Sequence, residues 1–135
     1  MHYKYCPLCG GLLARKSISL LNCSECGYRF YQTSNPTANA IITRTQGAAK
    51  QVLLTKRAQE PFKGCWDLPG GFLNNGEDPS CGLSREIAEE LGLKLSRLTL
   101  FSTFVERYPR PDIPEEAQFT LCLFYLAEIE QAPAL

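Results

Sequence analysis

Apolar and polar positions alternate with two different periods along residues 37–135, and these periods predict a domain of strands with one helix. Short runs rich in β-branched and aromatic residues predict strands, because such side chains suit a pleated, half-buried surface. A turn is expected at Gln46 and Gly47. Strands interleaved with a helix indicate an α/β or α+β domain. The predicted strands cover residues 38–44, 51–56, 66–72, 98–106 and 119–129.

The helical pattern lies between residues 78 and 92. Asp78 is a good N-cap, and Pro79 suits the first helical position, whose amide hydrogen has no partner within the helix. Gly92 suits the left-handed conformation that ends many helices. Apolar residues recur every four positions between these ends, so one face of the helix should pack on a core. This apolar stripe consists of Leu83, Ile87 and Leu91.

A stripe of three carboxylates, Glu86, Glu89 and Glu90, runs beside the apolar stripe. Three like charges on one face repel one another unless cations lie between them. Hard oxygen ligands select Mg²⁺ or Mn²⁺, and Mg²⁺ characteristically bridges a few carboxylates to substrate phosphates. Arg85 lies one turn from Glu89 and is well placed to orient it by a charged hydrogen bond. A solvated acidic helix face is the alternative interpretation.

Two glycines upstream of the helix favour the metal site over that alternative. Gly70 and Gly71 allow the backbone to approach a ligand closely, and exposed amides there would bind phosphate oxygens. Glycines alone are a weak signal, but an acidic helix directly after them is a strong one. The pattern therefore predicts a metal-bound phosphate site, with Gly70 and Gly71 contacting the substrate.

Two C-x₂-C pairs stand near the N-terminus, 13 residues apart and each followed by a glycine. Four thiolates suit a closed tetrahedral Zn²⁺ site, and the metal supplies the folding free energy that a short segment lacks. Residues 1–32 are therefore predicted to form a structural zinc ribbon, with strands near residues 16–21 and 28–31. The predicted ligands are Cys6, Cys9, Cys23 and Cys26.

The composition of the chain indicates its cellular compartment and the kinds of partner it binds. The 135 residues include 14 acidic and 14 basic side chains, so the chain lacks the basic charge that dominates nucleic-acid binding. No apolar run approaches the roughly 18 residues of a membrane span, and the N-terminus lacks the apolar core of a signal peptide. We therefore expect a cytoplasmic protein with no nucleic-acid or membrane partner and with reduced thiols. Cys65, Cys81 and Cys122 are expected to be small buried residues.

The 23 residues from Gly71 to Leu93 resemble the Nudix box, G-x₅-E-x₇-R-E-U-x-E-E-x-G-U, in which U is bulky and apolar. The resemblance extends over about residues 37–130, and it implies an α/β/α sandwich around a mixed sheet. All nine specified positions match, namely Gly71, Glu77, Arg85, Glu86, Ile87, Glu89, Glu90, Gly92 and Leu93.

The resemblance also implies a reaction, the attack of water on a phosphorus atom of a P–O–P linkage. Glu86, Glu89 and Glu90 would hold one to three divalent ions, and Glu77 would complete this metal site by supporting the loop or a metal-bound water. Arg85 would anchor a catalytic glutamate, and either Glu86 or Glu90 would be the base. Some family members take the base from outside the box, and the candidates for that role here are Glu106, Glu115 and Glu116.

A four-cysteine ribbon before a Nudix domain is similar to the architecture of bacterial NADH pyrophosphatases. Those enzymes carry S-Q-P-W-P-F-P-x-S after the box, whereas residues 102–112 here do not match it. The expected substrate is therefore a nucleoside diphosphate linked to another moiety, with ADP-ribose or a dinucleotide such as NADH favoured. Oxidised nucleoside triphosphates are another possibility, for which Phe62, Phe104 and Tyr108 offer rings that would stack a base.

Two further alternatives concern the whole chain. A catalytically silent nucleotide sensor with a docking ribbon is the main rival to an enzyme, although a sensor has no need of all three helix glutamates. The second concerns residues 37–135, because Nudix domains usually end in a helix and only six residues follow Ile129. Either the chain is a truncated version of a longer protein, or the ribbon or a second subunit covers that sheet face. We expect a homodimer.

Overall fold

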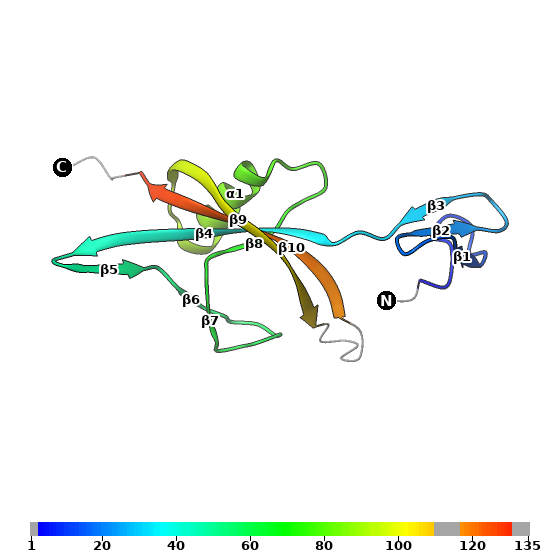
Figure 1. Ribbon diagram of the computed structural model, residues 1–135, viewed down its shortest axis with the longest axis horizontal. Coiled ribbons are helices and arrows are strands. Elements are labelled where there is room, and N and C mark those ends of the chain that lie inside the picture. Colours follow the sequence, from blue (N-terminus) through cyan, green and yellow to red (C-terminus); the bar gives the residue numbers. More distant parts are fainter. Residues whose placement is uncertain (1–2, 110–116, 131–135) are drawn as a thin grey trace.

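The structure is a computed structural model, and it describes residues 3–109 and 117–130 (Figure 1). A small N-terminal sheet lies at one end of a long strand, and that strand runs through the larger sheet with the helix beside it. Among the described residues, no helix is long and apolar enough to cross a membrane.

The N-terminal sheet is antiparallel, with β2 between β1 and β3. The expected strand at 16–21 is wrong in its first part, because Ser17 starts a turn instead. Its Oγ accepts hydrogen bonds from the amides of Ser19 and Leu20, at 3.3 and 3.2 Å. A serine side chain that binds nearby amides favours turns over strands. The three strands are β1 (Leu13–Arg15), β2 (Leu20–Cys23) and β3 (Arg29–Tyr31).

The larger sheet is mixed, as the resemblance implied. Its strands follow the order β5-β4-β10-β9, and β8 pairs with β4. The pairing of β10 with β4 is parallel, and all other pairings in this sheet are antiparallel. The bounds are β4 (Asn35–Gln46), β5 (Ala49–Val52), β8 (Gly70–Phe72), β9 (Leu95–Pro109) and β10 (Ala117–Ile129).

Two predicted strands are each divided in the structure. The predicted strand at 51–56 ends as β5 at Val52, although the Leu53 amide still donates to the carbonyl of Ile42 at 2.9 Å in register with the pairing of β4 and β5. The Leu53 side chain packs on the core. The predicted strand at 66–72 breaks at Pro69, which is fully buried and whose carbonyl accepts from Ala40 at 2.8 Å. The resulting short strands, β6 (Thr55–Lys56) and β7 (Trp66–Asp67), pair with each other.

The helix, α1 (Pro79–Leu91), has the predicted ends. The Asp78 side chain accepts hydrogen bonds from the hydroxyl of Ser80 at 2.5 Å and from the amide of Ser80 at 2.8 Å. Both hydrogen bonds lower the pKa of Asp78. Gly92 has φ 67° and caps the other end through its amide, which donates to Ala88. A side-chain cap and a left-handed glycine bind the backbone groups that helix ends leave free. Local sequence therefore specifies this element fully.

The core lies between α1 and one face of the larger sheet. Leu83 and Ile87 are fully buried there, and Leu91 is half-buried at the edge of the same cluster. The predicted apolar stripe is thus confirmed. The described residues contain this one helix, so a second helical layer of the sandwich is not among them. The sheet residues buried in the cluster are Ala38, Ala40, Ile42 and Ala127.

Candidate functional site

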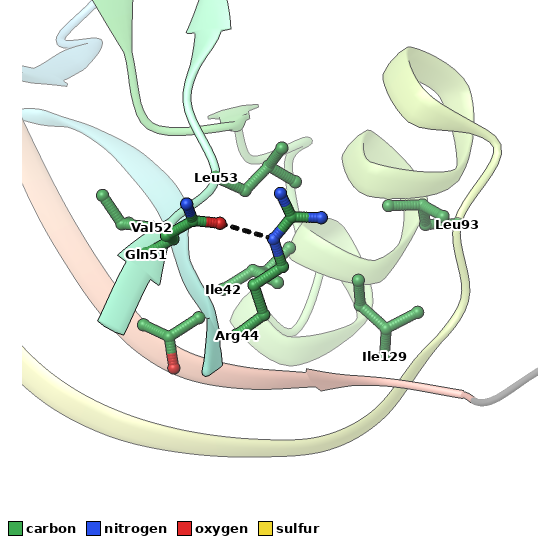
Figure 2. A pocket seen from close by; sticks show the side chains of 8 residues that line it. Ile42, Arg44, Gln51, Val52, Leu53, Leu93 and Ile129 are labelled. Carbon is green, nitrogen blue, oxygen red and sulfur yellow. Dashed lines mark hydrogen bonds between the residues drawn. The ribbon is translucent and has the colours of Figure 1, made fainter. Parts of the chain in front are cut away.

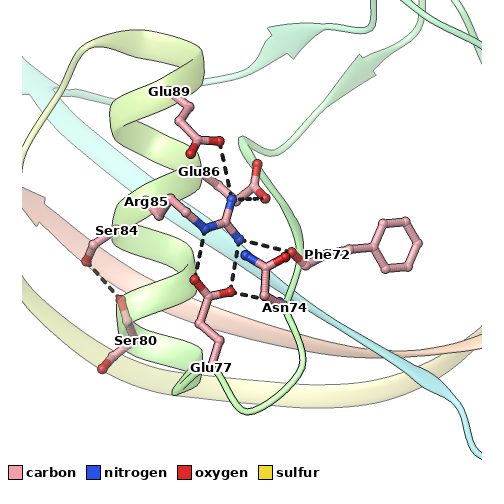
Figure 3. A network of polar contacts seen from close by, with 8 residues as sticks. All are labelled: Phe72, Asn74, Glu77, Ser80, Ser84, Arg85, Glu86 and Glu89. Atoms are coloured by element: carbon pink, nitrogen blue, oxygen red, sulfur yellow. Dashed lines mark hydrogen bonds and ion pairs between the residues drawn. The ribbon is translucent and has the colours of Figure 1, made fainter.

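The guanidinium of Arg85 binds three acidic side chains around it (Figure 3). Its Nε and Nη2 donate to the two carboxylate oxygens of Glu77, at 2.8 and 2.9 Å. Its Nη1 donates to Glu86 at 2.7 Å and to Glu89 at 3.2 Å. Nη2 also lies 3.3 Å from the carbonyl oxygen of Phe72. The predicted contact with Glu89 is present, but the bidentate pair with Glu77 is the principal one.

These contacts shift the pKa values of the bidentate pair, Glu77 and Arg85. Hydrogen bonds from Arg85 and from the backbone of Asn74 hold the pKa of Glu77 at about 2. The same carboxylates, Glu77 and then Glu86, raise the pKa of Arg85. Glu77 therefore stays ionised at neutral pH and connects the loop before α1 to the middle of the helix. The position of Glu86 depends on this connection, because both bind the same guanidinium.

Both glycines before the loop are in close contact with other parts of the protein. A Cβ atom on Gly71 would lie 2.6 Å from Cδ of Glu86, so the carboxylate lies directly against this backbone. Gly70 has φ 144°, and a Cβ there would overlap the carbonyl oxygen of Ala38 in β4. Packing thus supplies one reason for both glycines. Their predicted contact with substrate remains a prediction.

Glu90 lies apart from the Arg85 network and lines a cavity of about 610 Å³ with Lys56, Arg57 and Asp67. Partial burial raises the pKa of Glu90, and a hydrogen bond from the backbone of Gly70 opposes this shift. A cavity of this volume is in the range of small-molecule sites. It is the candidate for a substrate pocket, because it contains both a carboxylate of the box and two basic side chains.

A second cavity, of about 680 Å³, lies between β5 and the end of β10 (Figure 2). Its lining is mostly aliphatic, and its polar contact is the hydrogen bond from Arg44 to Gln51 at 2.7 Å. None of its described lining residues is a carboxylate, so it offers no anionic ligand for a cation. The lining residues include Ile42, Leu53, Leu93 and Ile129.

The structure brings the helix glutamates to one region without gathering their oxygens at one point. Within residues 3–109 and 117–130, no three carboxylates have ligand oxygens that all lie within 4.8 Å of one another. Glu86 and Glu89 bind Arg85, whereas Glu90 faces the cavity. The donor set still suits a hard divalent cation, because Mg²⁺ typically takes one or two carboxylates and completes its shell with water and phosphate oxygens.

The four predicted zinc ligands do meet at one point, with all sulfurs within 4.8 Å of one another. Sulfurs at about 2.3 Å from a tetrahedral Zn²⁺ are about 3.8 Å apart. The Sγ atoms of Cys6 and Cys26 are 3.7 Å apart, and those of Cys9 and Cys23 are 3.5 Å apart. Backbone hydrogen bonds from Cys26 and Glu25 lower the pKa of the Cys23 thiol to about 7. The pKa values of Cys9 and Cys26 are raised instead, because hydrogen bonds among the neighbouring thiols outweigh the backbone hydrogen bonds from Gly11 and Tyr28. The cluster is compatible with zinc.

The other three cysteines follow the prediction only in part. Cys122 is buried on β10, as expected. Cys65 and Cys81 are exposed, which contradicts the prediction of small buried residues. Cys65 lies in the loop before β7, and Cys81 lies two residues before the fully buried Leu83, on a face of the helix turned from the core. Neither position has the apolar periodicity that would have predicted burial.

Of the candidate carboxylates outside the box, one lies among the described residues. Glu106 lies on β9 and is 3.3 Å from the Thr120 hydroxyl, whereas Glu115 and Glu116 lie outside the described residues. Arg57 is a polar residue of the cavity that the sequence does not reveal; it donates to Asp67 at 3.0 Å and to the Tyr108 hydroxyl at 2.8 Å. No local motif contains these partners, because they lie 10 and 51 residues from Arg57.

Comparison with known proteins bears directly on this site. The sequence model of the NUDIX domain matches residues 33–134, which include the whole Arg85 network. This chain belongs to the NUDIX domain family. The expected mixed sheet is the fold of solved NUDIX structures as well. A NUDIX hydrolase from Nitrosomonas europaea superposes with a TM-score of 0.65 at 25% identity, over 97% of this chain and 70% of that one.

Two curated relatives of this chain carry names that state an activity. The ADP-ribose pyrophosphatase of Methanocaldococcus jannaschii is 39% identical over 85 residues, which cover 62% of this chain and 48% of the relative. The NAD-capped RNA hydrolase NudC of Haemophilus influenzae is 27% identical over 110 residues, which cover 79% of this chain and 40% of the relative. The chain therefore spans less than half the length of either relative.

Proposed function

We propose that this chain is a divalent-metal-dependent pyrophosphohydrolase. Its substrate is a nucleoside diphosphate linked to another moiety, and ADP-ribose or a dinucleotide such as NADH is favoured. The observation that carries the proposal is the Arg85 network, which fixes the Glu86 carboxylate against Gly71 beside a cavity that contains Glu90. The names of the two curated relatives, an ADP-ribose pyrophosphatase and an NAD-capped RNA hydrolase, support the substrate class.

The residues of the box have distinct proposed roles. Glu86, Glu89 and Glu90 hold Mg²⁺ or Mn²⁺, and Glu77 contributes through its bond to Arg85. When bound, the cation polarises the phosphate oxygens and lowers the pKa of water for attack on phosphorus. Glu86 or Glu90 accepts the proton of that water, and the raised pKa of Glu90 suits a group that takes up a proton.

The remaining residues position these groups. Arg85 orients Glu86 through the 2.7 Å hydrogen bond. The backbone of Gly70 and Gly71 contacts the phosphates, and Lys56 adds positive charge to the cavity that Glu90 lines. Structural zinc, held by the four clustered cysteines, maintains the ribbon. In this proposal the protein supplies orientation and a fixed charge distribution, which are the main requirements of phosphoryl chemistry.

A release assay tests the proposal. The purified chain is incubated with Mg²⁺ and each of NADH, ADP-ribose, dinucleoside polyphosphates, nucleotide sugars and nucleoside triphosphates, and the nucleotide products are separated by chromatography. We expect a nucleoside monophosphate from one of the first two substrates. The rival function, a silent sensor, predicts that a nucleotide binds without product formation, which would contradict the proposal.

Gly71→Ala should lower turnover by about a hundredfold, because its methyl group pushes aside the Glu86 carboxylate and small displacements of a catalytic group are costly. The fold should survive, since the obstructing atoms belong to the end of a flexible side chain.

Gly70→Ala should instead lower the unfolding free energy by about 1–3 kcal/mol, because it combines a left-handed φ with backbone overlap. Urea denaturation and steady-state kinetics on both variants measure these effects.

Gly76→Ala is the control for this pair. Gly76 has φ 78° but no heavy atom near its added Cβ, so it separates backbone strain from contact. We expect a modest loss of stability and nearly full turnover. Wild-type turnover in Gly71→Ala would show that the contact with Glu86 does not matter for the chemistry.

We also propose that the chain forms a homodimer. Several large apolar side chains on β9 and β10 are more than half exposed, and a second copy would cover them. They are Leu100, Phe101, Val105 and Phe119. Light scattering at micromolar concentration should give the mass of two chains, and a stable monomer would contradict this expectation.

A further inference from the structure

β9 forms a long unpaired edge of the larger sheet. It is 15 residues long and pairs with β10 on one side, and within residues 3–109 and 117–130 no strand pairs with its other side. The free amides and carbonyls of such an edge can pair with a strand of another chain, and proteins usually protect them with charged side chains or by keeping the edge strand short. In β9 only Arg97, Glu106 and Arg107 are charged. This edge is therefore open to a partner.

Apolar side chains on both faces of β9 are exposed. Leu100, Phe101, Phe104 and Val105 are each at least half exposed. Neighbouring residues of a strand point to opposite faces, so Phe104 and Val105 lie on different sides of the sheet. A molecule packed on one face would leave the side chains of the other face in water, whereas a strand added along the edge contacts the side chains of both faces. The exposure thus favours a partner strand.

A bulge near the middle of β9 determines which strand can pair with this edge. Leu100 pairs with Tyr125 and Ser102 pairs with Phe124, so Phe101 is an extra residue between them. An extra residue bends the strand locally, and a straight strand would not follow the bend. A second copy of β9 carries the same bulge, and in a two-fold symmetric pair the two bulges lie side by side. The edge therefore matches itself.

The bulge also reverses the alternation of side chains. Before it, Leu98 pairs with Ala127 and packs on the core beneath α1. After it, Thr103 pairs with Leu123, which pairs with the core residue Ala38, so Thr103 lies on that same face. Between residues 97 and 106, the even-numbered residues before the bulge and the odd-numbered residues after it thus share the face of α1. Two copies that pair antiparallel across their bulges keep these faces aligned only if even-numbered residues pair with odd-numbered ones.

One register that satisfies this rule also pairs opposite charges. With Arg97 beside Glu106 of the second copy, two-fold symmetry makes the same contact twice. Both side chains are exposed, and the long distance of 4.0 Å from Arg97 to the Glu128 carboxylate leaves Arg97 able to take another partner. A shift of two residues in either direction places Arg97 beside Phe104 or Tyr108 and loses both charge pairs. Charge complementarity therefore selects the register.

We infer that two copies of the chain pair antiparallel along the outer edges of β9, with Arg97 of each copy beside Glu106 of the other. This inference rests on the homodimer proposed above and deepens it by naming the interface and its register. Each copy contributes a five-stranded sheet, and the pairing joins the two into one continuous sheet. The two-fold axis passes between Phe101 and Ser102, which brings the two exposed Phe101 side chains near each other.

Sedimentation equilibrium of the zinc-loaded full chain tests this interface. Arg97→Glu and Glu106→Arg should each raise the dissociation constant of the dimer by about tenfold or more, because both symmetric contacts become like-charged. An equimolar mixture of the two variants should dimerise as wild type does, since each contact then joins opposite charges. Native mass spectrometry should identify these dimers as one chain of each variant. Rescue by a second chain cannot come from a change within either fold.

Lys50→Glu is the matched control, because it makes the same charge change at an exposed residue of β5, at the opposite end of the sheet. It should leave the dissociation constant unchanged, and circular dichroism melts confirm that each variant is folded. A wild-type dimer that neither reversal on β9 weakens, or a mixture that gains no dimers, would overturn the edge pairing and leave the homodimer standing. A monomeric wild type at micromolar concentration would refute the homodimer itself. The measured mass does not depend on hydrolysis, so the proposed chemistry is tested separately.

Discussion

Glu86→Gln should lower Mg²⁺-dependent turnover by about a hundredfold or more while the protein stays folded. The amide keeps the shape of the side chain and its place against Gly71, but it removes the negative charge that attracts a divalent cation. Arg85 retains Glu77 and Glu89 as partners, so the loop and helix remain connected. Steady-state kinetics over a range of Mg²⁺ concentrations, with circular dichroism melts, would measure both effects.

Two comparisons make this result specific. Glu90→Gln should cause a loss of similar size, because Glu90 lines the proposed substrate cavity. Glu130→Gln, an exposed glutamate outside the box, should leave turnover unchanged. Undiminished activity in both Glu86→Gln and Glu90→Gln would refute the proposed metal site. An equal loss in Glu130→Gln would point to a general effect of charge.

The helix and the cysteine cluster were predictable because their determinants are local. Asp78, Pro79 and Gly92 define the helix within 15 residues of sequence, and the cap geometry agrees with each of them. The cysteine pairs carry their own spacing, and the sulfurs meet as that spacing indicates. Short-range backbone hydrogen bonding and metal stereochemistry leave few alternatives for such segments.

Other features depend on contacts that no local pattern contains. The predicted strand at 51–56 is divided between β5 and β6, and Leu53 between them packs on a core formed by distant strands. Arg57 joins Tyr108, 51 residues away, and Tyr108 in turn orders Phe62 and Phe72. The sequence suggests Phe62 and Tyr108 as candidate stacking residues, but no pattern in it places them together or adds Phe72 to them. Tertiary packing decided all of these positions.

Gly71 shows that a complete motif match still leaves the side-chain contacts unspecified. Matching the box located Gly71, but the match does not reveal that Glu86 occupies the space where a Cβ would be. Likewise the helix spacing placed three glutamates side by side, whereas the side chains of Glu86 and Glu89 turn towards Arg85. Rotamers and ion pairs, which spacing does not specify, thus determine how the charges of the box are arranged.

Zinc removal should unfold the N-terminal ribbon while leaving the box network in place. The ribbon strands contain three, four and three residues, too few to bury a core that would hold them without metal. Binding of structural zinc contributes on the order of 10 kcal/mol to small sites of this kind, which exceeds what such a sheet supplies. Hydrogen exchange after treatment with a zinc-selective chelator should therefore show loss of protection across residues 3–31, with protection of α1 retained.

Single-cysteine variants separate metal binding from other effects of the thiols. Cys6→Ser removes a buried sulfur of the cluster and should reproduce the chelated state, whereas Cys65→Ser, at an exposed cysteine outside it, should retain zinc and protection. Turnover measured with excess Mg²⁺ should fall far less in Cys6→Ser than in Glu86→Gln, because no described hydrogen bond of the Arg85 network reaches the ribbon. A zinc-free protein that keeps ribbon protection yet loses all turnover would instead assign the ribbon a direct part in the chemistry.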